Sequence, residues 1–270
     1  MFPPTKILLP VDFSERCLGA ARYAEALAAH SHAEIALLHV LEPNRAASAR
    51  SELDTYLTEE LAGVRVQRVL LEGDPARQIV EFAHRERMDL IALPTHGHGP
   101  FRRFILGSVT AKVLHDADCP VWTGVHLEQA PQVDAIAFRS IVCALDLGPQ
   151  SRKALAWAAA MAGEFKARLT LVHALPCIES RPGEYFDQEL LADLAKSARE
   201  ELEKLREEAG AEAELVAQGG DAPHVVCAAA QARQAEMLVI GRGSAAGHFG
   251  RLRTNAYAII RQSPCPVVSV

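Results

Sequence analysis

Two stretches of the chain, KILLPVDFS at residues 6–14 and SIVCALDLG at residues 140–148, share one layout and decide the fold. Each is a short apolar run that ends in an aspartate, Asp12 or Asp146, and each precedes an alanine-rich segment of helical character. A second apolar run follows in both halves and carries a histidine, His39 or His173. The two aspartates and the two histidines are each 134 residues apart, and such a shared offset indicates an internal repeat.

Later landmarks extend this repeat to the end of the chain. Gly73-Asp74 matches Gly220-Asp221 at an offset of 147, and Cys119-Pro120 matches Cys265-Pro266 at an offset of 146. The second half therefore holds about thirteen extra residues, which we place in its charged helical segment around 189–208. We predict two homologous domains, residues 1–126 and 138–270.

Each half alternates apolar runs with helical segments. Runs this continuous are typical of parallel strands that are buried on both faces. We expect helices after Ser14, which is a candidate capping residue, after Asp74-Pro75 and after Gly107-Ser108. The alternation predicts an α/β fold of two doubly wound parallel sheets. In the first half the expected strands lie at residues 6–11, 35–40, 64–71, 89–93 and 120–124.

Composition excludes several classes of protein. The 270 residues are 49% hydrophobic and 23% charged, which is a globular balance. A net charge of -6 and an aromatic content of 6% argue against nucleic acid and anionic membranes as partners. No apolar run approaches the ~20 residues of a membrane span. Six cysteines are too few for a disulfide scaffold, and the amino-terminal residues lack a signal peptide's layout, so we expect reduced thiols in a cytoplasmic protein.

The candidate ligand site lies where ligands bind in doubly wound sheets, outside the carboxyl ends of the strands. Asp12 could accept hydrogen bonds from ribose hydroxyls or help to hold a metal, and apolar residues at neighbouring strand ends could border a base. A glycine-rich loop that leads into a helix offers N–H groups to phosphate, and nearby hydroxyls add donors. The predicted binding residues of the first half are Val11, Asp12, Val40, Leu93, Gly97, Gly107, Ser108, Val109 and Thr110.

At these residues the chain resembles the universal stress protein family in its tandem two-domain form. The family signature is a glycine, two residues, a glycine, nine residues, then a glycine and a serine or threonine. Gly97, nine residues and Gly107-Ser108 match it, while Pro94 stands at the first glycine. The resemblance implies a flavodoxin-like strand order of 3-2-1-4-5 in each domain. It also implies ATP as the ligand, with any Mg²⁺ bridging the phosphates, in a stress-related sensor or regulator that is not a committed enzyme.

The second half keeps part of this pattern. Asp146 retains the acid, and Gly241 and Gly243 follow the fourth apolar run. Arg253-Thr254 stands where the first half has Gly107-Ser108, and we include Thr254 with Asp146, Gly241 and Gly243 as predicted binding residues.

Other functions are alternatives. The protein could be a tandem stress protein that has lost nucleotide binding and acts as a scaffold or partner-binding regulator, or it could be a slow ATP hydrolase. An NAD fingerprint is rejected because Gly241 and Gly243 follow the fourth strand instead of the first. His96 and His98 have no further ligands at an identifiable spacing, so we expect no metal site. We expect His39 and His173 to pack or hydrogen-bond, not to catalyse.

The last strand of each half is short and apolar, around residues 120–123 and 266–270. An apolar edge strand with unpaired N–H and C=O groups tends to find a partner strand. We therefore expect the two strands to pair antiparallel about a pseudo-twofold axis, as dimeric members of the family also suggest. Pairing of two chains into a homodimer stays open.

Overall fold

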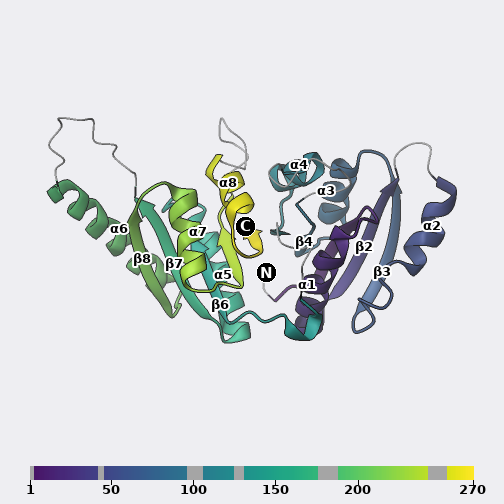
Figure 1. The fold of residues 1–270 in the computed structure, drawn as a ribbon, viewed down its shortest axis with the longest axis horizontal. Coiled ribbons are helices and arrows are strands. Elements are labelled where there is room, and N and C mark those ends of the chain that lie inside the picture. Colours follow the sequence, from purple (N-terminus) through teal and green to yellow (C-terminus); the bar gives the residue numbers. More distant parts are fainter. Residues whose placement is uncertain (1–2, 42–45, 96–105, 125–130, 176–187, 243–253) are drawn as a thin grey trace.

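The chain folds into two α/β units, one from each half, that lie side by side (Figure 1). The structure is a computed structural model that describes residues 3–41, 46–95, 106–124, 131–175, 188–242 and 254–270. The first half contains β1 (Lys6–Val11), α1 (Arg16–Ser31), β2 (Glu34–Leu41), α2 (Ala46–Thr55), β3 (Arg65–Glu72), α3 (Pro75–Arg85), β4 (Leu90–Ala92), α4 (Ser108–Asp116) and β5 (Val121–Thr123). A short 3-10 turn, η2 (Val133–Ala135), lies between the halves. The second half contains β6 (Ser140–Ala144), α5 (Ser151–Phe165), β7 (Arg168–Leu175), α6 (Gln188–Glu208), β8 (Ala213–Gly219), α7 (Ala222–Ala232), β9 (Met237–Ile240), α8 (Thr254–Gln262) and β10 (Val267–Ser269).

Within the described residues the strands form one sheet of ten, in the order β3-β2-β1-β4-β5-β10-β9-β6-β7-β8. Within each half the order is 3-2-1-4-5 and all neighbours are parallel, so the expected doubly wound fold is confirmed. The two sheets are continuous because β5 and β10 pair antiparallel, which confirms the expected pairing of the terminal strands.

The strand register at this junction pairs residues that are equivalent in the two halves of the repeat. Trp122 pairs with Val268, and these two residues are equivalent at the offset of 146. On the helices above, His30 of α1 contacts Glu164 of α5 at 3.1 Å, and these residues are equivalent at the offset of 134. Equivalent positions meet one another only on a twofold axis, so the axis passes through both contacts.

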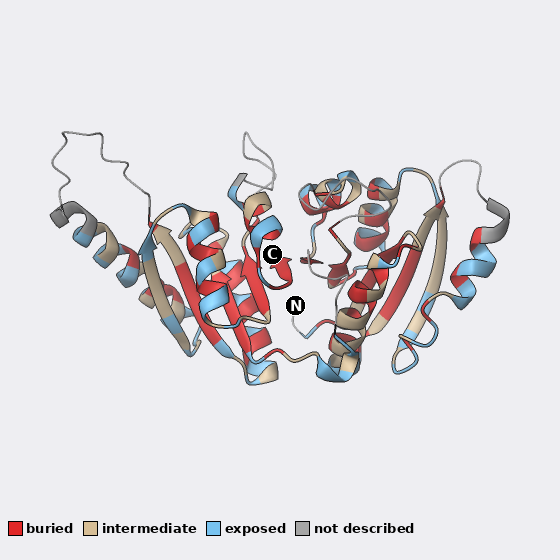
Figure 2. Ribbon diagram, in the orientation of Figure 1, coloured by how far each residue is buried: buried red, intermediate tan, exposed pale blue. Residues whose placement is uncertain are grey.

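Two helical layers cover the sheet. One hydrophobic core contains buried residues of α1, α2, α5 and α6, and the other contains those of α3, α4, α7 and α8. Each core runs through the junction, since Trp122 and Val268 belong to the first and Val121 and Val267 to the second. Figure 2 shows that the central strands are almost wholly buried. The two halves therefore share their cores.

Aromatic rings strengthen the junction on the α1 and α5 side. The Trp122 ring lies 5.3 Å from that of Tyr23 and 5.8 Å from that of Phe138, and Phe138 lies 4.9 Å from Phe165. Edge-on aromatic pairs at such distances add roughly 0.5–1.5 kcal/mol each beyond the burial of their area.

The expected helix starts are confirmed in part. Asp74 caps α3 by accepting a hydrogen bond from the Arg77 backbone N–H at 2.9 Å, with Pro75 as the first helical residue. The expectation that Ser14 caps α1 is wrong, because the N-cap is Glu15 and no side chain caps the helix. The Asp12 carboxylate accepts the Ser14 backbone N–H instead, across a turn in which Phe13 has a φ of 63°.

The extra residues of the second half lengthen one helix. α2 has 10 residues and its counterpart α6 has 21, as the charged segment around 189–208 predicts. The carboxyl-terminal part of α6 packs on the sheet through Ala198, Leu202 and Leu205. In Figure 1 this helix extends beyond the edge of the sheet.

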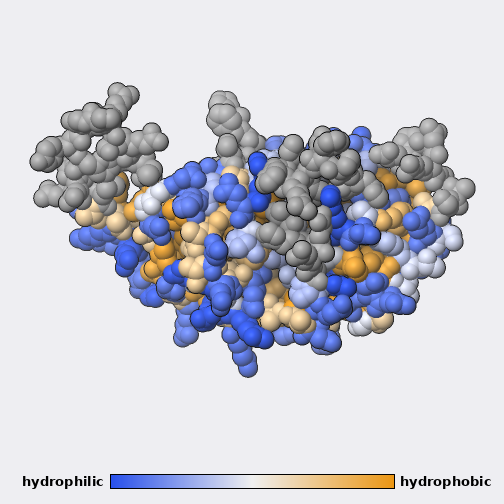
Figure 3. Space-filling model, in the orientation of Figure 1, coloured by the Kyte–Doolittle hydropathy of each residue, from blue (hydrophilic) through white to orange (hydrophobic). Residues whose placement is uncertain are grey.

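The visible face of the molecule is mostly hydrophilic, with smaller hydrophobic areas between (Figure 3). Among the helices that the structure describes, none combines the length and the apolar character needed to cross a bilayer.

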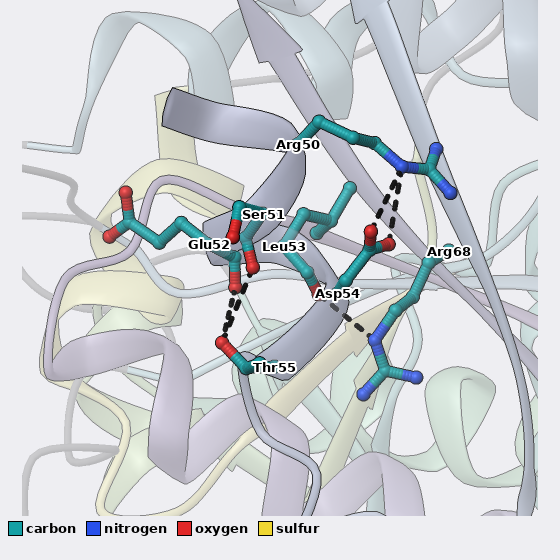
Figure 4. Close-up of polar contacts among 7 residues, drawn as sticks. All are labelled: Arg50, Ser51, Glu52, Leu53, Asp54, Thr55 and Arg68. Carbon is teal, nitrogen blue, oxygen red and sulfur yellow. Dashed lines mark hydrogen bonds and ion pairs between the residues drawn. The ribbon is translucent and has the colours of Figure 1, made fainter. Parts of the chain in front are cut away.

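Arg68 of β3 fastens α2 to the sheet (Figure 4). Its guanidinium donates to the Leu53 carbonyl at 2.9 Å, the Tyr56 carbonyl at 3.1 Å and the Thr58 hydroxyl at 3.2 Å. The last carbonyls of a helix have no partner within the helix, and a cation there also suits the helix dipole. The neighbouring Arg50–Asp54 pair lies on the exposed face of α2.

We expect Arg68→Met to lower the free energy of unfolding by about 1–2 kcal/mol, because it removes hydrogen bonds from a charged donor. Arg50→Met is the matched control and should change it by less than about 0.5 kcal/mol, as is typical of exposed i,i+4 pairs. Urea denaturation measures both. Equal losses in the two variants would contradict this role of Arg68.

Candidate functional site

The first aspartate, Asp12, lies directly after β1 at the carboxyl edge of the sheet. Its Oδ1 accepts the backbone N–H of Ser14 at 3.0 Å and the thiol of Cys17 at 3.2 Å. Burial, followed by the charge of Asp12, raises the pKa of the Cys17 thiol to about 12. The thiol therefore stays protonated at neutral pH and remains a donor to Asp12.

The second aspartate repeats this arrangement. Oδ1 of Asp146 accepts the backbone N–H of Gly148 at 2.8 Å and the hydroxyl of Ser151 at 3.1 Å. Ser151 is equivalent to Cys17 at the offset of 134, so a hydroxyl takes the place of the thiol. Each carboxylate is thus oriented by its own loop. A carboxylate has two oxygens, which together can accept more hydrogen bonds than the two described for each aspartate.

The histidines lie beside the aspartates. The Nδ1 atoms of His39 and His173 lie 2.8 Å from the carbonyls of Val11 and Leu145. A carbonyl can only accept, so Nδ1 donates. This confirms the expectation that they are hydrogen-bonding residues. In the first half the Phe13 ring covers His39 at 4.2 Å, whereas the second half has Leu147 at that position.

The start of α4 is joined to the loop after β4. Gly107 is the N-cap, and its N–H donates to the Thr95 carbonyl at 2.8 Å. The Thr110 hydroxyl is buried and donates to the Pro94 carbonyl at 3.0 Å. This bond joins the helix to the loop after β4. We expected the hydroxyl to donate to a phosphate, whereas here it donates to the chain itself. Ser108 is exposed and Val109 is half-buried in the first turn.

The apolar residues expected to border a base belong to two different cores. Val11 packs in the core beneath α1, whereas Leu93 and the half-buried Val40 pack with the core beneath α3 and α4. Side chains alternate between the faces of a sheet, and the sequence pattern alone did not assign each strand end to a face. Gly97, His96 and His98 lie outside the described residues.

A cavity of about 320 Å³ lies at the carboxyl edge of the second half. This volume falls within the range typical of small-molecule sites. Of the residues predicted for this half, the cavity brings together Asp146 and Gly241. Gly243 lies outside the described residues, and Thr254 begins α8. The other described lining residues are Ala144, Leu145, Pro149, Gln150, Ser151, Ala154, Val172, His173, Ala174, Ala222, Val226, Ile240, Arg242, Asn255, Ala256 and Ile259.

This cavity is the repeat counterpart of the site predicted in the first half. The offset of 134 takes Val11, Asp12 and Val40 to Leu145, Asp146 and Ala174. The offset of 147 takes Leu93 to Ile240, and that of 146 takes Val109 and Thr110 to Asn255 and Ala256. All six counterparts line the cavity. Applying the repeat offsets to the first-half residues would have found five lining residues that the sequence motifs missed, namely Leu145, Ala174, Ile240, Asn255 and Ala256.

The cavity combines an apolar interior with groups that suit an anion. Ala174, Val226, Ile240 and Ile259 supply apolar wall. The amino-terminal ends of three helices border it, through Ser151 of α5, Ala222 of α7 and Asn255 of α8. Unpaired N–H groups and the helix dipoles at such ends favour negative charge. Asp146 is the acidic group at the strand end, where hydroxyl groups of a ligand would find an acceptor.

Two other cavities are less suitable. A groove of about 870 Å³ lies between the halves and is bordered by Arg87, Met88, Lys153 and Trp157, but it contains none of the predicted residues. A cavity of about 400 Å³ lies at the amino ends of β6 and β7, away from the edge where doubly wound sheets bind ligands. Within the described ranges, no three His, Cys, Asp or Glu side chains gather as a metal site.

The cysteines that the structure describes are free thiols. Burial raises the pKa of Cys119 and of Cys227 to about 11, and that of Cys265 to about 12. Such thiols are poor nucleophiles at neutral pH.

Comparison with known proteins identifies the same repeat. The sequence profile of the universal stress protein family matches residues 4–123 and again residues 137–270. A universal stress protein of Methanocaldococcus jannaschii is 33% identical over 134 residues, which cover 43% of this chain and 79% of that protein. One from Thermus aquaticus is 35% identical over 129 residues, with 43% of this chain and 94% of that protein covered.

A solved structure matches over the whole length. The crystal structure of a universal stress protein from Archaeoglobus fulgidus aligns with a TM-score of 0.75 at 22% identity, covering 99% of this chain and 98% of the other. At this level of identity the likeness concerns the fold, and it includes both halves.

Proposed function

Because this chain belongs to the universal stress protein family in tandem form, we propose that it is a stress-response protein that binds an ATP-class nucleotide. It acts as a sensor or regulator, and its nucleotide site is the cavity of the second half. The observation that carries the proposal is the agreement between that cavity and the positions predicted for the first half. Six predicted positions, transferred by the repeat offsets, line one cavity of suitable size.

Each part of a nucleotide has a counterpart in the cavity. The base lies against Ala174, Val226 and Ile240, which form the apolar wall. Asp146 accepts hydrogen bonds from the ribose hydroxyls. The phosphates lie over the amino-terminal end of α8, at Asn255, where the helix dipole favours them. Any Mg²⁺ would be held mainly through the phosphates of the nucleotide and would offset their charge, in keeping with its preference for substrate phosphates over all-protein cages.

Calorimetric titration of the purified protein with ATP, with Mg²⁺ in excess, tests the proposal. We expect wild type to bind and Asp146→Ala to bind about 10–100 times more weakly, because a hydrogen bond to a charged group contributes roughly 1.5–3 kcal/mol. Asp12→Ala is the matched control, since it removes the equivalent carboxylate and its hydrogen bonds within the other half. It should bind ATP like wild type.

Other outcomes are equally informative. Weaker binding in Asp12→Ala but not in Asp146→Ala would place the site in the first half. Wild type that binds no ATP would overturn the proposal and favour a scaffold. Release of radiolabelled phosphate from bound ATP, at a rate above that of a protein-free control, would indicate a hydrolase instead of a regulator.

A further inference from the structure

Arg242 connects the candidate cavity to the other half of the molecule. It is the second residue after β9, following Gly241, and it lines the cavity of the second half. Its guanidinium is buried and donates to three carbonyls of the first half: Leu114 at 3.2 Å, Ala117 at 2.9 Å and Cys119 at 2.6 Å. Its backbone N–H donates to the Val270 carbonyl at 2.8 Å, which fixes the residue at the edge of the sheet.

The three carbonyls lie at or just beyond the end of α4. Leu114 is in its last turn, and Ala117 is its C-cap. These are the positions where helix carbonyls lack partners and where a cation is favoured. At its other end α4 is joined to the loop after β4 through Gly107 and Thr110. A helix of nine residues is only ~13 Å long. One short helix therefore joins the carboxyl edge of the first half to the cavity wall of the second.

The two halves differ at this position. The repeat counterpart of Arg242 at the offset of 147 is Thr95, whose hydroxyl donates to the Gly124 carbonyl within its own half at 3.3 Å. Arg242 thus breaks the pseudo-twofold symmetry at a residue that lines the cavity.

We propose that Arg242 is a positioning residue that couples the second-half cavity to α4. A ligand in the cavity stabilises α4, and loosening α4 weakens the binding of the ligand. Such coupling is reciprocal by thermodynamic necessity. The coupling of cavity wall and helix stands on the hydrogen bonds above, while the statement about a ligand rests on the proposed function.

The first experiment needs no ligand. Amide hydrogen exchange is measured by NMR at the Ala117 N–H, which is bonded to the Val113 carbonyl within α4. We expect Arg242→Met to speed this exchange about fivefold or more, as for a typical coupling energy. Arg68→Met is the matched control, because it removes the same chemistry from the end of α2 and should leave Ala117 unchanged. An Ala117 rate in Arg242→Met equal to that of wild type would overturn the proposal.

The second experiment perturbs the helix and observes the cavity. Val113→Ala removes buried methyl groups from α4 without touching the cavity, and we expect it to speed exchange at the Arg242 N–H and to weaken ATP binding about fivefold. In the Arg242→Met background, Val113→Ala should no longer affect ATP binding. Ile79→Val, a core truncation in α3, is the control for general loosening and should leave both readouts unchanged.

The outcomes separate the two proposals. If wild type binds no ATP, the proposed function fails, and the exchange rates at Ala117 and Arg242 still decide the coupling. If ATP binds but Val113→Ala weakens ATP binding equally in the wild-type and the Arg242→Met backgrounds, the proposed coupling through Arg242 is wrong. The proposed binding site is then unaffected.

Discussion

Val268→Pro will lower the free energy of unfolding by about 3 kcal/mol or more and will loosen the contact between the two halves. Val268 lies in β10, which has a neighbour on both sides, β5 and β9, and it pairs with its own repeat counterpart Trp122. Proline removes an N–H donor from this ladder, and in a central strand its ring has no space. Because both cores continue through the junction, the damage will extend to each half.

Two measurements check this result. The melting temperature should fall by several degrees, and solution scattering should report a larger radius of gyration. Val268→Ala is the matched control, since it shortens the same side chain and keeps the N–H. The difference between the proline and alanine variants measures the contribution of the backbone. Wild-type melting and compactness in Val268→Pro would contradict the role of this strand pair.

Gly220→Ala will lower the free energy of unfolding by about 2–3 kcal/mol. Gly220 follows β8 with a φ of +146°, a conformation that residues with a side chain rarely adopt. An added Cβ would also lie 2.8 Å from Cγ2 of Val225, a buried residue of α7. The clash requires the Val225 side chain or the backbone to shift, and the strain lies in the turn just before α7, which borders the candidate cavity at Ala222.

Two other glycines distinguish the effect of backbone strain from that of the Cβ clash. Gly219 has no atom within 4 Å of an added Cβ and no positive φ, so Gly219→Ala should be nearly neutral. Gly73, the repeat counterpart of Gly220, has a φ of +131° but only an ordinary contact at 3.4 Å to the flexible Gln78 side chain. Gly73→Ala should therefore lie between the two. Urea denaturation of the three variants measures this order, and equal losses at Gly219 and Gly220 would contradict the argument.

The fold could be predicted because its signals are local and occur twice. A strand that is buried on both faces must be apolar along its length, so the runs at 6–11 and 35–40 identify β1 and β2 without any knowledge of their neighbours. Asp74-Pro75 marks the start of α3 for an equally local reason. The repeat then doubled the information, and the apolar ends of the two halves predicted the antiparallel pair of β5 and β10.

The candidate site was predicted only in outline. Sequence placed Asp12 and Asp146 at strand ends, and the structure finds both there with matching hydrogen bonds. The sequence could not show that Val11 and Leu93 lie in different cores, because the assignment of a strand end to a face depends on which helices cover it. The division into residues 1–126 and 138–270 and the homodimer stay predictions.

By itself, then, the sequence determined the strands, their repeat and the family, since these depend on residue patterns within short windows. Only the tertiary structure decided the partners of individual side chains. The Thr110 hydroxyl bonds to Pro94, and the Arg242 guanidinium bonds to carbonyls more than 120 positions earlier in the chain. A hydroxyl or guanidinium can satisfy its hydrogen bonds in many ways, and the choice is made by whichever buried carbonyls the packed helices leave without a partner.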